Sequence, residues 1–377
     1  MHIPLLDLNA QLDEIRDELK IAVDDVIEST RYIMGPRVTE FERELADYCN
    51  VEHGIGVSSG TDALLVSLMA LDVGPDDIVL TTDYSFFATA GVIARLRARP
   101  VFLDIDPDTY NLDPAKLKEW LENNEDKIEK VKAIVPVHLF GQCADMKPII
   151  KTARKYDIPV IEDAAQAIGA RYPGNGKPLK AGSMGLMGCF SFFPSKNLGG
   201  LGDGGMVVTR NEEIAEKLRK LRNHGAAPKY YHSMIGGNFR LDAIQAAALN
   251  VKLKYLDEWH KKRQENADYY NRHLTDKIKK PENVYRHDYH IYNQYIINLP
   301  ENRDEFKKYL RKKQIGFGIY YPVPFHLQEC FEYLGYKLGD FPASEYAAEH
   351  TIALPVYPEL STENQDYVIE AVNDFFK

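Results

Sequence analysis

A single lysine, Lys196, stands in a sequence context suited to covalent chemistry on a carbonyl compound. It follows a strand-like run at residues 189–193 and precedes a loop with five glycines between Gly199 and Gly205. So many glycines indicate backbone conformations or close approaches that a side chain would block. A lysine among apolar neighbours loses hydration, which lowers its pKa and leaves a free base able to form a Schiff base. A surface lysine beside a flexible loop is the alternative interpretation.

Residues 58–63 have the composition of an anion-binding turn. They follow a short strand and open a predicted helix. Free backbone N–H groups and the helix dipole would therefore face a ligand at this point. Gly60 lets the backbone approach that ligand closely. The same residues also suit an ordinary helix capped by serine or threonine, so the segment alone decides nothing.

A carboxylate ends the next informative strand. The run 161–166 places Glu162 and Asp163 at the end of an apolar strand predicted at residues 159–162. In open α/β sheets, the carboxyl ends of the strands border the ligand crevice. A fixed carboxylate there suits a ring nitrogen or a metal ion. Capping of the next helix by one of the two acids is the alternative.

Together, the three segments supply what pyridoxal phosphate requires. The helix start would bind the phosphate, and the carboxylate would keep the pyridine nitrogen protonated. The lysine would form the Schiff base and later move a proton. The combination is more specific than any one of its parts. The GxxxxGK[ST] pattern of a Walker phosphate loop is absent from the glycine-rich segment.

Short β-rich runs alternate with helical patterns through the first 210 residues and must position these segments. Apolar runs such as 78–80 and 133–135 are typical of strands buried on both faces of a mostly parallel sheet. We expect an open α/β sheet with right-handed crossovers. Strands are predicted at 54–57, 77–82, 100–104, 133–136, 159–162, 189–193 and 206–209. Helices are predicted at 62–70, 88–97, 114–122 and 146–155.

The pattern changes after about Arg210. Helices are predicted at 212–222 and 241–264, the second continuing to about residue 274, and later at 303–313 and 363–376. Strand-like runs occupy 295–299 and 316–321. We expect a smaller α+β domain packed on the larger one, with the two domains at 1–250 and 251–377.

The composition is ordinary for a folded protein: 377 residues, 45% hydrophobic and 27% charged. With 46 basic and 56 acidic residues, the net charge of −10 is opposite to that of a general nucleic-acid coat protein. No stretch approaches the ~18–20 apolar residues of a membrane span, and the N-terminus lacks a signal-peptide pattern. The four cysteines are too widely spaced for a zinc pattern. We expect a cytoplasmic protein with reduced thiols, no metal, and neither a nucleic-acid nor a membrane partner.

With these motifs the chain resembles the DegT/DnrJ-type sugar aminotransferases, within the aspartate-aminotransferase (fold type I) superfamily. The resemblance covers nearly the whole chain, and its most specific part is the block 191–205. It implies a large domain with a mostly parallel seven-stranded sheet and a smaller α+β C-terminal domain. Further matching runs lie at 31–36, 110–114, 138–142, 237–247 and 321–326.

The resemblance implies roles for individual residues around the cofactor. Lys196 would be the Schiff-base lysine, and Asp163 would pair with the pyridine nitrogen. Gln166 would hydrogen-bond the ring oxygen O3′. Phe86 falls where the family places an aromatic ring that stacks on the cofactor. Read alone, a phenylalanine such as Phe86 is more often a core residue than a stacking platform.

The resemblance also implies how the phosphate is held. Gly60, Thr61 and Ser191 would hold it from the same chain, and Asn238 would reach it from the neighbouring subunit. The active unit would then be a homodimer whose active sites are shared across the interface. Asn238 follows two glycines and on its own suits a simple turn.

The implied reaction is a ping-pong transamination. L-Glutamate would donate the amino group, with pyridoxamine phosphate as the intermediate form, and a keto sugar on a nucleotide diphosphate would accept it. Arg240 and Tyr321 would line the sugar pocket, whereas Tyr320 stands where the family often has histidine. The motifs look most like the subgroup acting on UDP-linked 3-keto hexoses or hexuronates, for surface polysaccharide or other glycan. A dTDP-linked 3-keto or 4-keto deoxysugar is the close alternative.

Two hypotheses from other classes remain. One is a non-catalytic, cofactor-binding regulator on the same fold, although the fold pattern begins within the first dozen residues and shows no added basic module. The other is a nicotinamide-dependent enzyme, because residues 200–205 formally match GxGxxG. That motif should follow a strand and open a helix, whereas here it leads into the strand predicted at 206–209.

Overall fold

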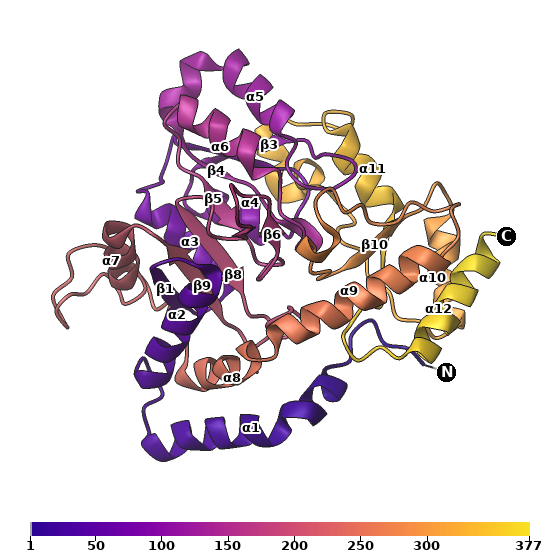
Figure 1. Cartoon of the computed structure of the whole chain (residues 1–377). Coiled ribbons are helices and arrows are strands. Elements are labelled where there is room, and N and C mark those ends of the chain that lie inside the picture. The colour runs from indigo at the N-terminus through magenta and orange to yellow at the C-terminus, as the bar shows by residue number, and fades with distance from the viewer. Residues whose placement is uncertain (1) are drawn as a thin grey trace.

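A mixed sheet lies at the centre of the larger part of the protein, and the computed structural model describes residues 2–377 (Figure 1). Within these residues the strands of this sheet are β1 (His53–Val57), β2 (Ile78–Thr82), β3 (Arg99–Leu103), β4 (Val131–Val135), β5 (Ile161–Asp163), β8 (Met187–Ser191) and β9 (Gly205–Thr209). Two hydrogen-bonded groups have the orders β1-β9-β8-β5 and β3-β2-β4. Isolated parallel bridges join β4 to β5, pairing Ile134 with Val160 and Val137 with Asp163.

The combined sheet has the order β1-β9-β8-β5-β4-β2-β3. Neighbouring strands are parallel except at β9, which runs antiparallel to both β1 and β8. The prediction of a mostly parallel α/β sheet is confirmed. The carboxyl ends of β2, β4, β5 and β8 meet at one edge, which is where a ligand crevice is expected.

Helices cover both faces of this sheet. Along β2, Ile78 and Leu80 point into one apolar cluster and Val79 into another, as the two-residue period of a strand requires. The first cluster is closed by α1 (Leu8–Ser29), α2 (Pro36–Cys49), α5 (Pro114–Asn123), α6 (Met146–Lys155) and α8 (Ala243–Leu253). The second is closed by α3 (Gly60–Ala70), α4 (Ala88–Arg95) and α7 (Glu212–Leu221).

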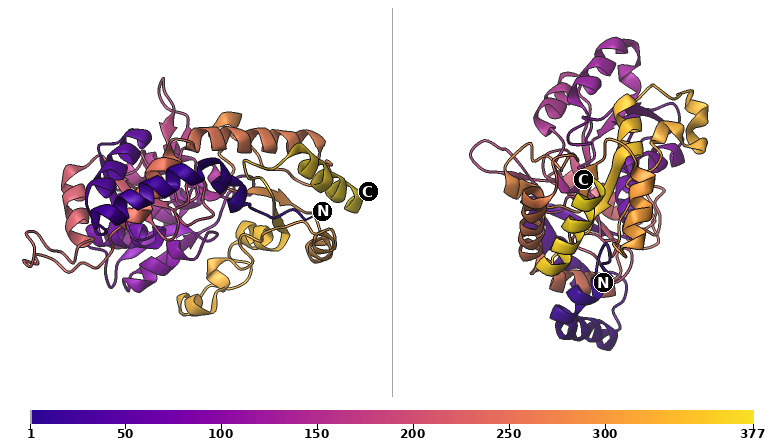
Figure 2. Two further views of the ribbon diagram at one scale, coloured as in Figure 1. Left: turned by 90° about the horizontal axis from the view of Figure 1, so that it is seen from below. Right: turned by 90° about the vertical axis from the view of Figure 1, so that its right-hand side faces the viewer.

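The C-terminal part has a small sheet and a cluster of its own. Strand β10 (Tyr295–Asn298) pairs antiparallel with β11 (Thr351–Leu354). The N-terminal Ile3 also belongs to this cluster and pairs with Ile315, so the two ends of the chain lie close together (Figures 1 and 2). The helices here are α9 (Leu256–His273), α10 (Arg303–Lys312), α11 (Pro342–His350) and α12 (Thr362–Phe375).

Shorter elements complete the described chain. A two-stranded hairpin pairs β6 (Arg171–Tyr172) with β7 (Leu179–Lys180). The 3-10 helices are η1 (Glu125–Lys130), η2 (Leu139–Gly141), η3 (His287–Tyr289), η4 (Phe325–Leu327) and η5 (Glu329–Leu334).

The single long helix predicted from residue 241 to about 274 is wrong, because the chain breaks into α8 and α9. At the break, the backbone N–H of Tyr255 donates to the Lys252 carbonyl at 3.1 Å, a three-residue bond that tightens the turn. The side chain of Lys252 is buried and donates from Nζ to the Gly199 carbonyl at 2.7 Å. The domain boundary placed at residue 250 falls inside α8 and stays a prediction.

The strand predicted at residues 316–321 is also wrong. Only Gly318 pairs with a neighbouring strand residue, Ala353, in an isolated bridge. Further along, the Tyr84 hydroxyl forms hydrogen bonds with both polar groups of the peptide that joins Tyr320 to Tyr321. It donates to the Tyr320 carbonyl at 2.6 Å and accepts from the Tyr321 N–H at 2.8 Å. A side chain therefore replaces the ladder that a strand would need.

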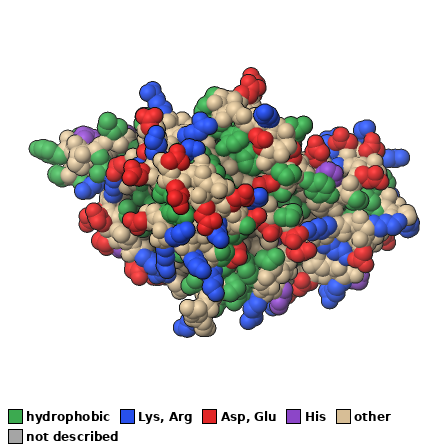
Figure 3. Space-filling model, turned by 90° about the horizontal axis from the view of Figure 1, so that it is seen from above, with side chains coloured by type: hydrophobic (Ala, Val, Ile, Leu, Met, Phe, Trp, Pro, Cys, Tyr) green, Lys and Arg blue, Asp and Glu red, His purple; other side chains and the backbone are tan. Residues whose placement is uncertain are grey.

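The surface carries acidic and basic side chains intermixed over the face drawn in Figure 3, with apolar side chains on the extension at its left end. That extension is the segment after α7, where Tyr230, Tyr231 and Ile235 are 78%, 72% and 90% exposed. Such exposed apolar groups, close together in sequence, are typical of an interaction surface. No helix in residues 2–377 combines the length and the apolar character needed to span a bilayer.

Candidate active site

A pocket of about 540 Å³ opens at the edge of the sheet where β2, β4, β5 and β8 end. The start of α3 forms one side, and the segment around Tyr320 forms another. A volume of this size is typical of sites for cofactors and small molecules. Eight residues predicted from the sequence line it: Gly60, Thr61, Phe86, Asp163, Gln166, Ser191, Lys196 and Tyr321.

Lys196 enters this pocket from the turn that follows β8. Its backbone N–H donates to the Phe193 carbonyl at 2.8 Å and closes the turn. Burial lowers the pKa of the Lys196 amine to about 8, against the opposing pull of the Asp163 carboxylate. The amine is therefore much closer to its neutral, nucleophilic form at neutral pH than an exposed lysine is.

The glycine loop after Lys196 is held by side chains of α8. The Leu201 N–H donates to Oε1 of Gln245 at 2.7 Å, and Lys252 holds the Gly199 carbonyl as described above. A Cβ atom at position 199 would lie 2.2 Å from the Pro194 carbonyl oxygen. Close approach of two backbone segments thus explains a glycine at this position.

Asp163 ends β5 and faces the pocket while only 4% exposed. Its Oδ2 accepts from the Thr89 hydroxyl at 2.7 Å, and its Oδ1 accepts from the Ala165 N–H at 3.2 Å. Burial raises the pKa of Asp163, whereas these bonds and the Lys196 charge pull it down. A carboxylate accepts more than two hydrogen bonds, so Asp163 retains capacity for a protonated ring nitrogen in the pocket.

The neighbouring acid, Glu162, points to the opposite face of the sheet, as alternation along a strand requires. It is fully buried, and its oxygens accept from the N–H groups of Gly182, Met184 and Gly185 at 2.5–2.7 Å. The His138 ring lies 2.8 Å from the same carboxylate. Of the two acids in the motif, Asp163 alone reaches the pocket, and neither caps a helix.

The start of α3 forms the anion-binding end of the pocket. The Ser59 hydroxyl caps the helix by accepting from the Asp62 N–H at 3.0 Å. Gly60 and Thr61 follow with backbone N–H groups in the first turn, where helices have no internal acceptors. A Cβ atom on Gly60 would lie 2.6 Å from Cβ of Ser191, which lines the same end.

The tight space at Gly60 gives a direct prediction. Gly60→Ala should weaken binding of pyridoxal phosphate by about tenfold and destabilise the fold by about 1–3 kcal/mol, because the added methyl group displaces Ser191. A titration of apoprotein with the cofactor and a thermal unfolding curve would measure the two effects. The matched control is Gly74→Ala, since a Cβ at Gly74 meets nothing within 4 Å. Equal cofactor affinity in both variants would contradict the assignment of the phosphate to this helix start.

An aromatic and amide wall closes the side of the pocket nearest the C-terminal part. The Gln166 amide accepts from the Phe140 N–H at 2.8 Å and donates to the Tyr321 hydroxyl at 2.9 Å. The Phe86 ring is 56% exposed and lies 6.2 Å from the Tyr321 ring. An exposed ring beside a pocket is available for stacking on a ligand, which a core phenylalanine is not.

Two predicted residues lie outside the lining of this chain's pocket. Asn238 is exposed on the extension after α7. The Arg240 guanidinium donates from Nη1 to Oδ1 of Asn223 at 2.8 Å, and its buried Nε has no hydrogen-bond partner among the described residues. Their roles stay predictions.

Several lining residues were not predicted from the sequence. Ser85, Asp203 and Gln294 also line the pocket, and the Thr89 hydroxyl donates to Asp163. Tyr320, noted in the sequence only because the family often has histidine there, lines the pocket too. The hydroxyls of Ser85 and Thr89 lie 3.3 Å apart, one helical turn apart in the segment that carries Phe86. The spacing of these two hydroxyl residues is visible in the sequence and would have indicated a polar pair beside Phe86. Gln294 gives no comparable local signal, because the C-terminal fold alone brings it to the pocket.

The residues present fit pyridoxal phosphate. The helix start and Ser191 form a cradle that a Cβ on Gly60 would fill. A buried carboxylate, Asp163, lines the same pocket as an amine of lowered pKa, Lys196. These are the anion site, the partner for a ring nitrogen and the covalent lysine that the cofactor requires.

Comparison with known proteins identifies the family. Residues 13–373 match the DegT/DnrJ/EryC1/StrS aminotransferase family. The chain belongs to this family. The match spans nearly the whole chain and includes every pocket residue described above.

Relatives with different names share this similarity. A pleiotropic regulatory protein of Geobacillus stearothermophilus is 46% identical over 100% of this chain and 99% of its own. The UDP-N-acetyl-3-dehydro-alpha-D-glucosamine 3-aminotransferase of Acidithiobacillus ferrooxidans is 40% identical over 96% and 94%. The dTDP-3-amino-3,6-dideoxy-alpha-D-galactopyranose transaminase of Aneurinibacillus thermoaerophilus is 40% identical over 99% of each chain. Because the chain is 40% identical to both a UDP-sugar enzyme and a dTDP-sugar enzyme, these comparisons do not decide which nucleotide its substrate carries.

Solved structures agree with the fold. DesV of S. venezuelae, determined with a ketimine intermediate, superposes with a TM-score of 0.93 at 36% identity over 99% of this chain and 98% of its own. NtdA of Bacillus subtilis, determined with the bound cofactor pyridoxamine phosphate (PMP), superposes with a TM-score of 0.87 at 30% identity over 98% and 84%. The predicted family, its fold type I architecture and its class of pyridoxal-phosphate-dependent sugar aminotransferases are confirmed.

Proposed function

We propose that this protein transfers an amino group from L-glutamate to a nucleotide-linked keto sugar, with pyridoxal phosphate bound in the pocket around Lys196. One observation carries the proposal: Lys196 and Asp163 line the same pocket as the start of α3. The acceptor we propose is a UDP-linked 3-keto hexose or hexuronate. We further propose a cytoplasmic role in surface polysaccharide or other glycan synthesis.

The roles of the side chains follow from their positions. When bound, pyridoxal phosphate supplies an aldehyde for amine exchange and a ring that withdraws electrons from the reacting carbon. The N–H groups of Gly60 and Thr61, with the Ser191 hydroxyl, would bind the phosphate. Asp163 would keep a proton on the ring nitrogen, and Lys196 Nζ would take the proton from Cα of the amino donor. The aromatic wall would orient the ring and exclude water.

We propose that a second copy completes the site. The apolar extension after α7 exposes Tyr230 and Ile235, and the same segment carries Asn238. Burial of these side chains against another copy would bring Asn238 toward the neighbouring phosphate site. Arg240 follows on the same segment, so its contact with the sugar would also come across the interface. Sedimentation of the holoenzyme would test this, with a stable monomer as the contradicting result.

The lowered pKa of Lys196 makes loading of the apoenzyme dependent on pH. Only the neutral amine adds to an aldehyde, so the rate of covalent attachment should rise about tenfold per pH unit below pH 8 and level off above it. Stopped-flow absorbance with excess pyridoxal phosphate would measure the profile. A midpoint near 10.5, the ordinary value for lysine, would contradict a buried amine at this position.

Turnover with two acceptors tests the substrate proposal. Purified holoenzyme with glutamate should aminate a UDP-linked 3-keto hexose or its 3-keto hexuronate with higher kcat/KM than a dTDP-linked 3-keto deoxyhexose. The reverse order would replace the UDP proposal with its dTDP alternative.

A specific observation favours a second candidate function, because the 46% identical relative is named a regulatory protein. A non-catalytic regulator would bind pyridoxal phosphate yet show no amino transfer to any acceptor. The cofactor titration and the turnover assay together separate the two functions.

A further inference from the structure

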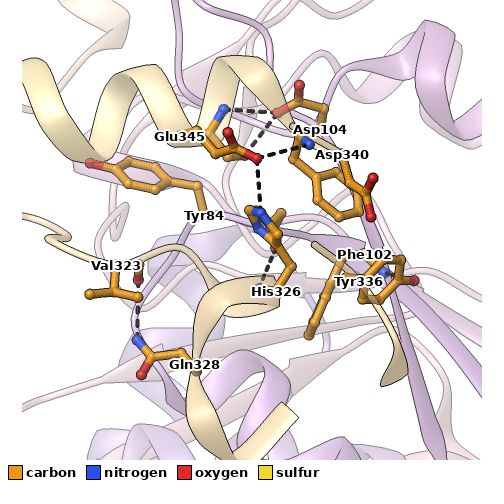
Figure 4. Close-up of polar contacts among 12 residues, drawn as sticks. Tyr84, Phe102, Asp104, Val323, His326, Gln328, Tyr336, Asp340 and Glu345 are labelled. Carbon is orange, nitrogen blue, oxygen red and sulfur yellow. Dashed lines mark hydrogen bonds and ion pairs between the residues drawn. The ribbon is translucent and has the colours of Figure 1, made fainter. Parts of the chain in front are cut away.

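His326 is buried between two carboxylates beside the active-site pocket. Its ring Nδ1 lies 2.6 Å from Oδ2 of Asp83, and its ring Nε2 lies 3.0 Å from Oε1 of Glu345. The side chains of His326 and Asp83 are fully buried, and that of Glu345 is 15% exposed. Figure 4 shows the ring of His326 pointing toward Glu345 of α11, with Asp104 on the other side of that helix end.

This geometry determines the protonation of His326. An ionised carboxylate only accepts hydrogen bonds, so a ring with a carboxylate oxygen at each nitrogen must donate from both. His326 is then an imidazolium shared by Asp83 and Glu345. Burial pulls the pKa of His326 down, but the bonds and charges of both carboxylates outweigh burial and raise it. Burial also raises the pKa of Asp83 to about 6, so Asp83 is ionised at neutral pH.

The other charged groups nearby are already occupied. Asp104, which follows β3, accepts from the N–H groups of Ala343 and Ser344 and from the Ser344 hydroxyl at 2.8–3.0 Å. Glu345 also accepts from the Gly339 N–H at 2.7 Å. Asp104 therefore joins the end of β3 directly to the start of α11. His326 joins the end of β2 to the same helix through its bonds to Asp83 and Glu345.

The segments joined by His326 carry pocket residues. Asp83 also accepts from the His326 N–H at 2.9 Å, and its carbonyl accepts from the Phe325 N–H at 2.8 Å. The next residue, Tyr84, holds the backbone of Tyr320 and Tyr321 as described above. Phe86 follows two residues later and lies against Tyr321. These bonds hold together two segments that lie about 240 residues apart in sequence, the one that carries Phe86 and the one that carries Tyr321.

We propose that His326 is a positioning residue of the active site, clamping the segment that carries Tyr321 to the strand end that carries Phe86. His326 does not itself line the pocket. Instead, its bond to Asp83 sets where the Tyr321 hydroxyl meets Gln166 and where the Phe86 ring lies. Only the measurement of kcat depends on the proposed function.

Two conservative variants separate the two bonds. The amide nitrogen of His326→Asn replaces ring Nδ1 and keeps the bond to Asp83, whereas that of His326→Gln replaces Nε2 and keeps the bond to Glu345. We expect the glutamine variant to bind pyridoxal phosphate more weakly and to lower kcat about 10- to 100-fold, because small displacements of catalytic walls have effects of this size. The asparagine variant should keep kcat within about threefold of the parent's value. His287→Gln, at an exposed histidine, is the matched control.

A second measurement works without turnover. In 15N-histidine NMR spectra of the apoprotein, the His326 signal, assigned by its loss in the asparagine variant, should show a doubly protonated ring at pH 7.5. An unperturbed histidine is mostly neutral there. A neutral His326 ring at this pH would contradict the proposal that His326 donates to both Asp83 and Glu345.

The outcomes are distinct. Equal cofactor affinity and kcat in both variants, with thermal unfolding curves like the parent's, would overturn the proposal. Equal losses in both would do so too, because they would indicate a general structural role. If the parent itself transfers no amino group, the proposed function fails, while cofactor affinity and the NMR signal still decide the role of His326.

Discussion

Replacement of Lys196 by alanine is expected to reduce amino transfer by at least about 10³-fold. The amine is the covalent attachment point and also the base that moves the proton, and proton transfer alone contributes about 10²–10⁴-fold. Steady-state assays with glutamate and the preferred keto sugar would measure the loss. Non-covalent binding of the cofactor should persist, because Gly60, Thr61 and Ser191 are unchanged in the variant.

The control for Lys196 is a lysine outside the pocket. Lys217 lies on α7 and pairs with Asp72 at the surface, so Lys217→Ala should retain the parent's kcat. Mass spectrometry after borohydride reduction would show whether the cofactor is attached to the chain. Retention of attachment and of turnover in the Lys196 variant would place the reactive amine elsewhere.

Asp163→Asn is expected to lower kcat by about 10²–10⁴-fold with a much smaller effect on cofactor affinity. Asparagine keeps the size of the side chain and can still accept from the Ala165 N–H. It removes the negative charge that would keep a proton on the ring nitrogen. The amide cannot replace that charge, so the ring would withdraw electrons less strongly.

The effect of Asp163→Asn must be separated from the effect of Thr89. Thr89→Val removes the hydrogen bond to Oδ2 of Asp163 but keeps the charge. It should lower kcat less than the asparagine variant does, because it loosens the carboxylate and raises the pKa of Asp163 but keeps the ionisable group. A larger loss in Thr89→Val than in Asp163→Asn would contradict the electrostatic role of the carboxylate.

The strands that carry the site were predictable from local sequence. Residues 77–82, 159–162 and 189–193 were predicted as strands, and the observed β2, β5 and β8 lie within two residues of those limits. Burial on both faces demands continuous apolar runs, and that requirement is visible in the sequence without any partner. Because parallel strands share one carboxyl edge, the positions of Asp163 and Lys196 followed from the same pattern.

The wall formed by the C-terminal part was not predictable in the same way. The segment around Tyr320 is shaped by the Tyr84 hydroxyl and by the Asp83–His326 contact, both more than 230 residues away in sequence. Bonds from a distant side chain to a backbone leave no periodicity in either segment. The alternation of Gly316 to Tyr321 therefore resembled a strand although its backbone partner is a hydroxyl group.

The break between α8 and α9 has a similar origin. The residues from Leu241 to Leu274 include no proline or glycine, so no helix-breaking residue marks the turn at Tyr255. Lys252, buried on the last turn of α8, binds the Gly199 carbonyl of the active-site loop. A contact of this kind depends on tertiary structure, which overrides local helix propensity.

Absorbance spectroscopy of the holoenzyme before and after addition of L-glutamate tests the central claim most directly. If Lys196 and Asp163 work as proposed, the visible band of cofactor attached to the protein should disappear on addition of glutamate and return with an acceptor keto sugar. The Lys196→Ala variant should show neither change. A band that ignores glutamate in the parent protein would contradict an aminotransferase that uses this donor.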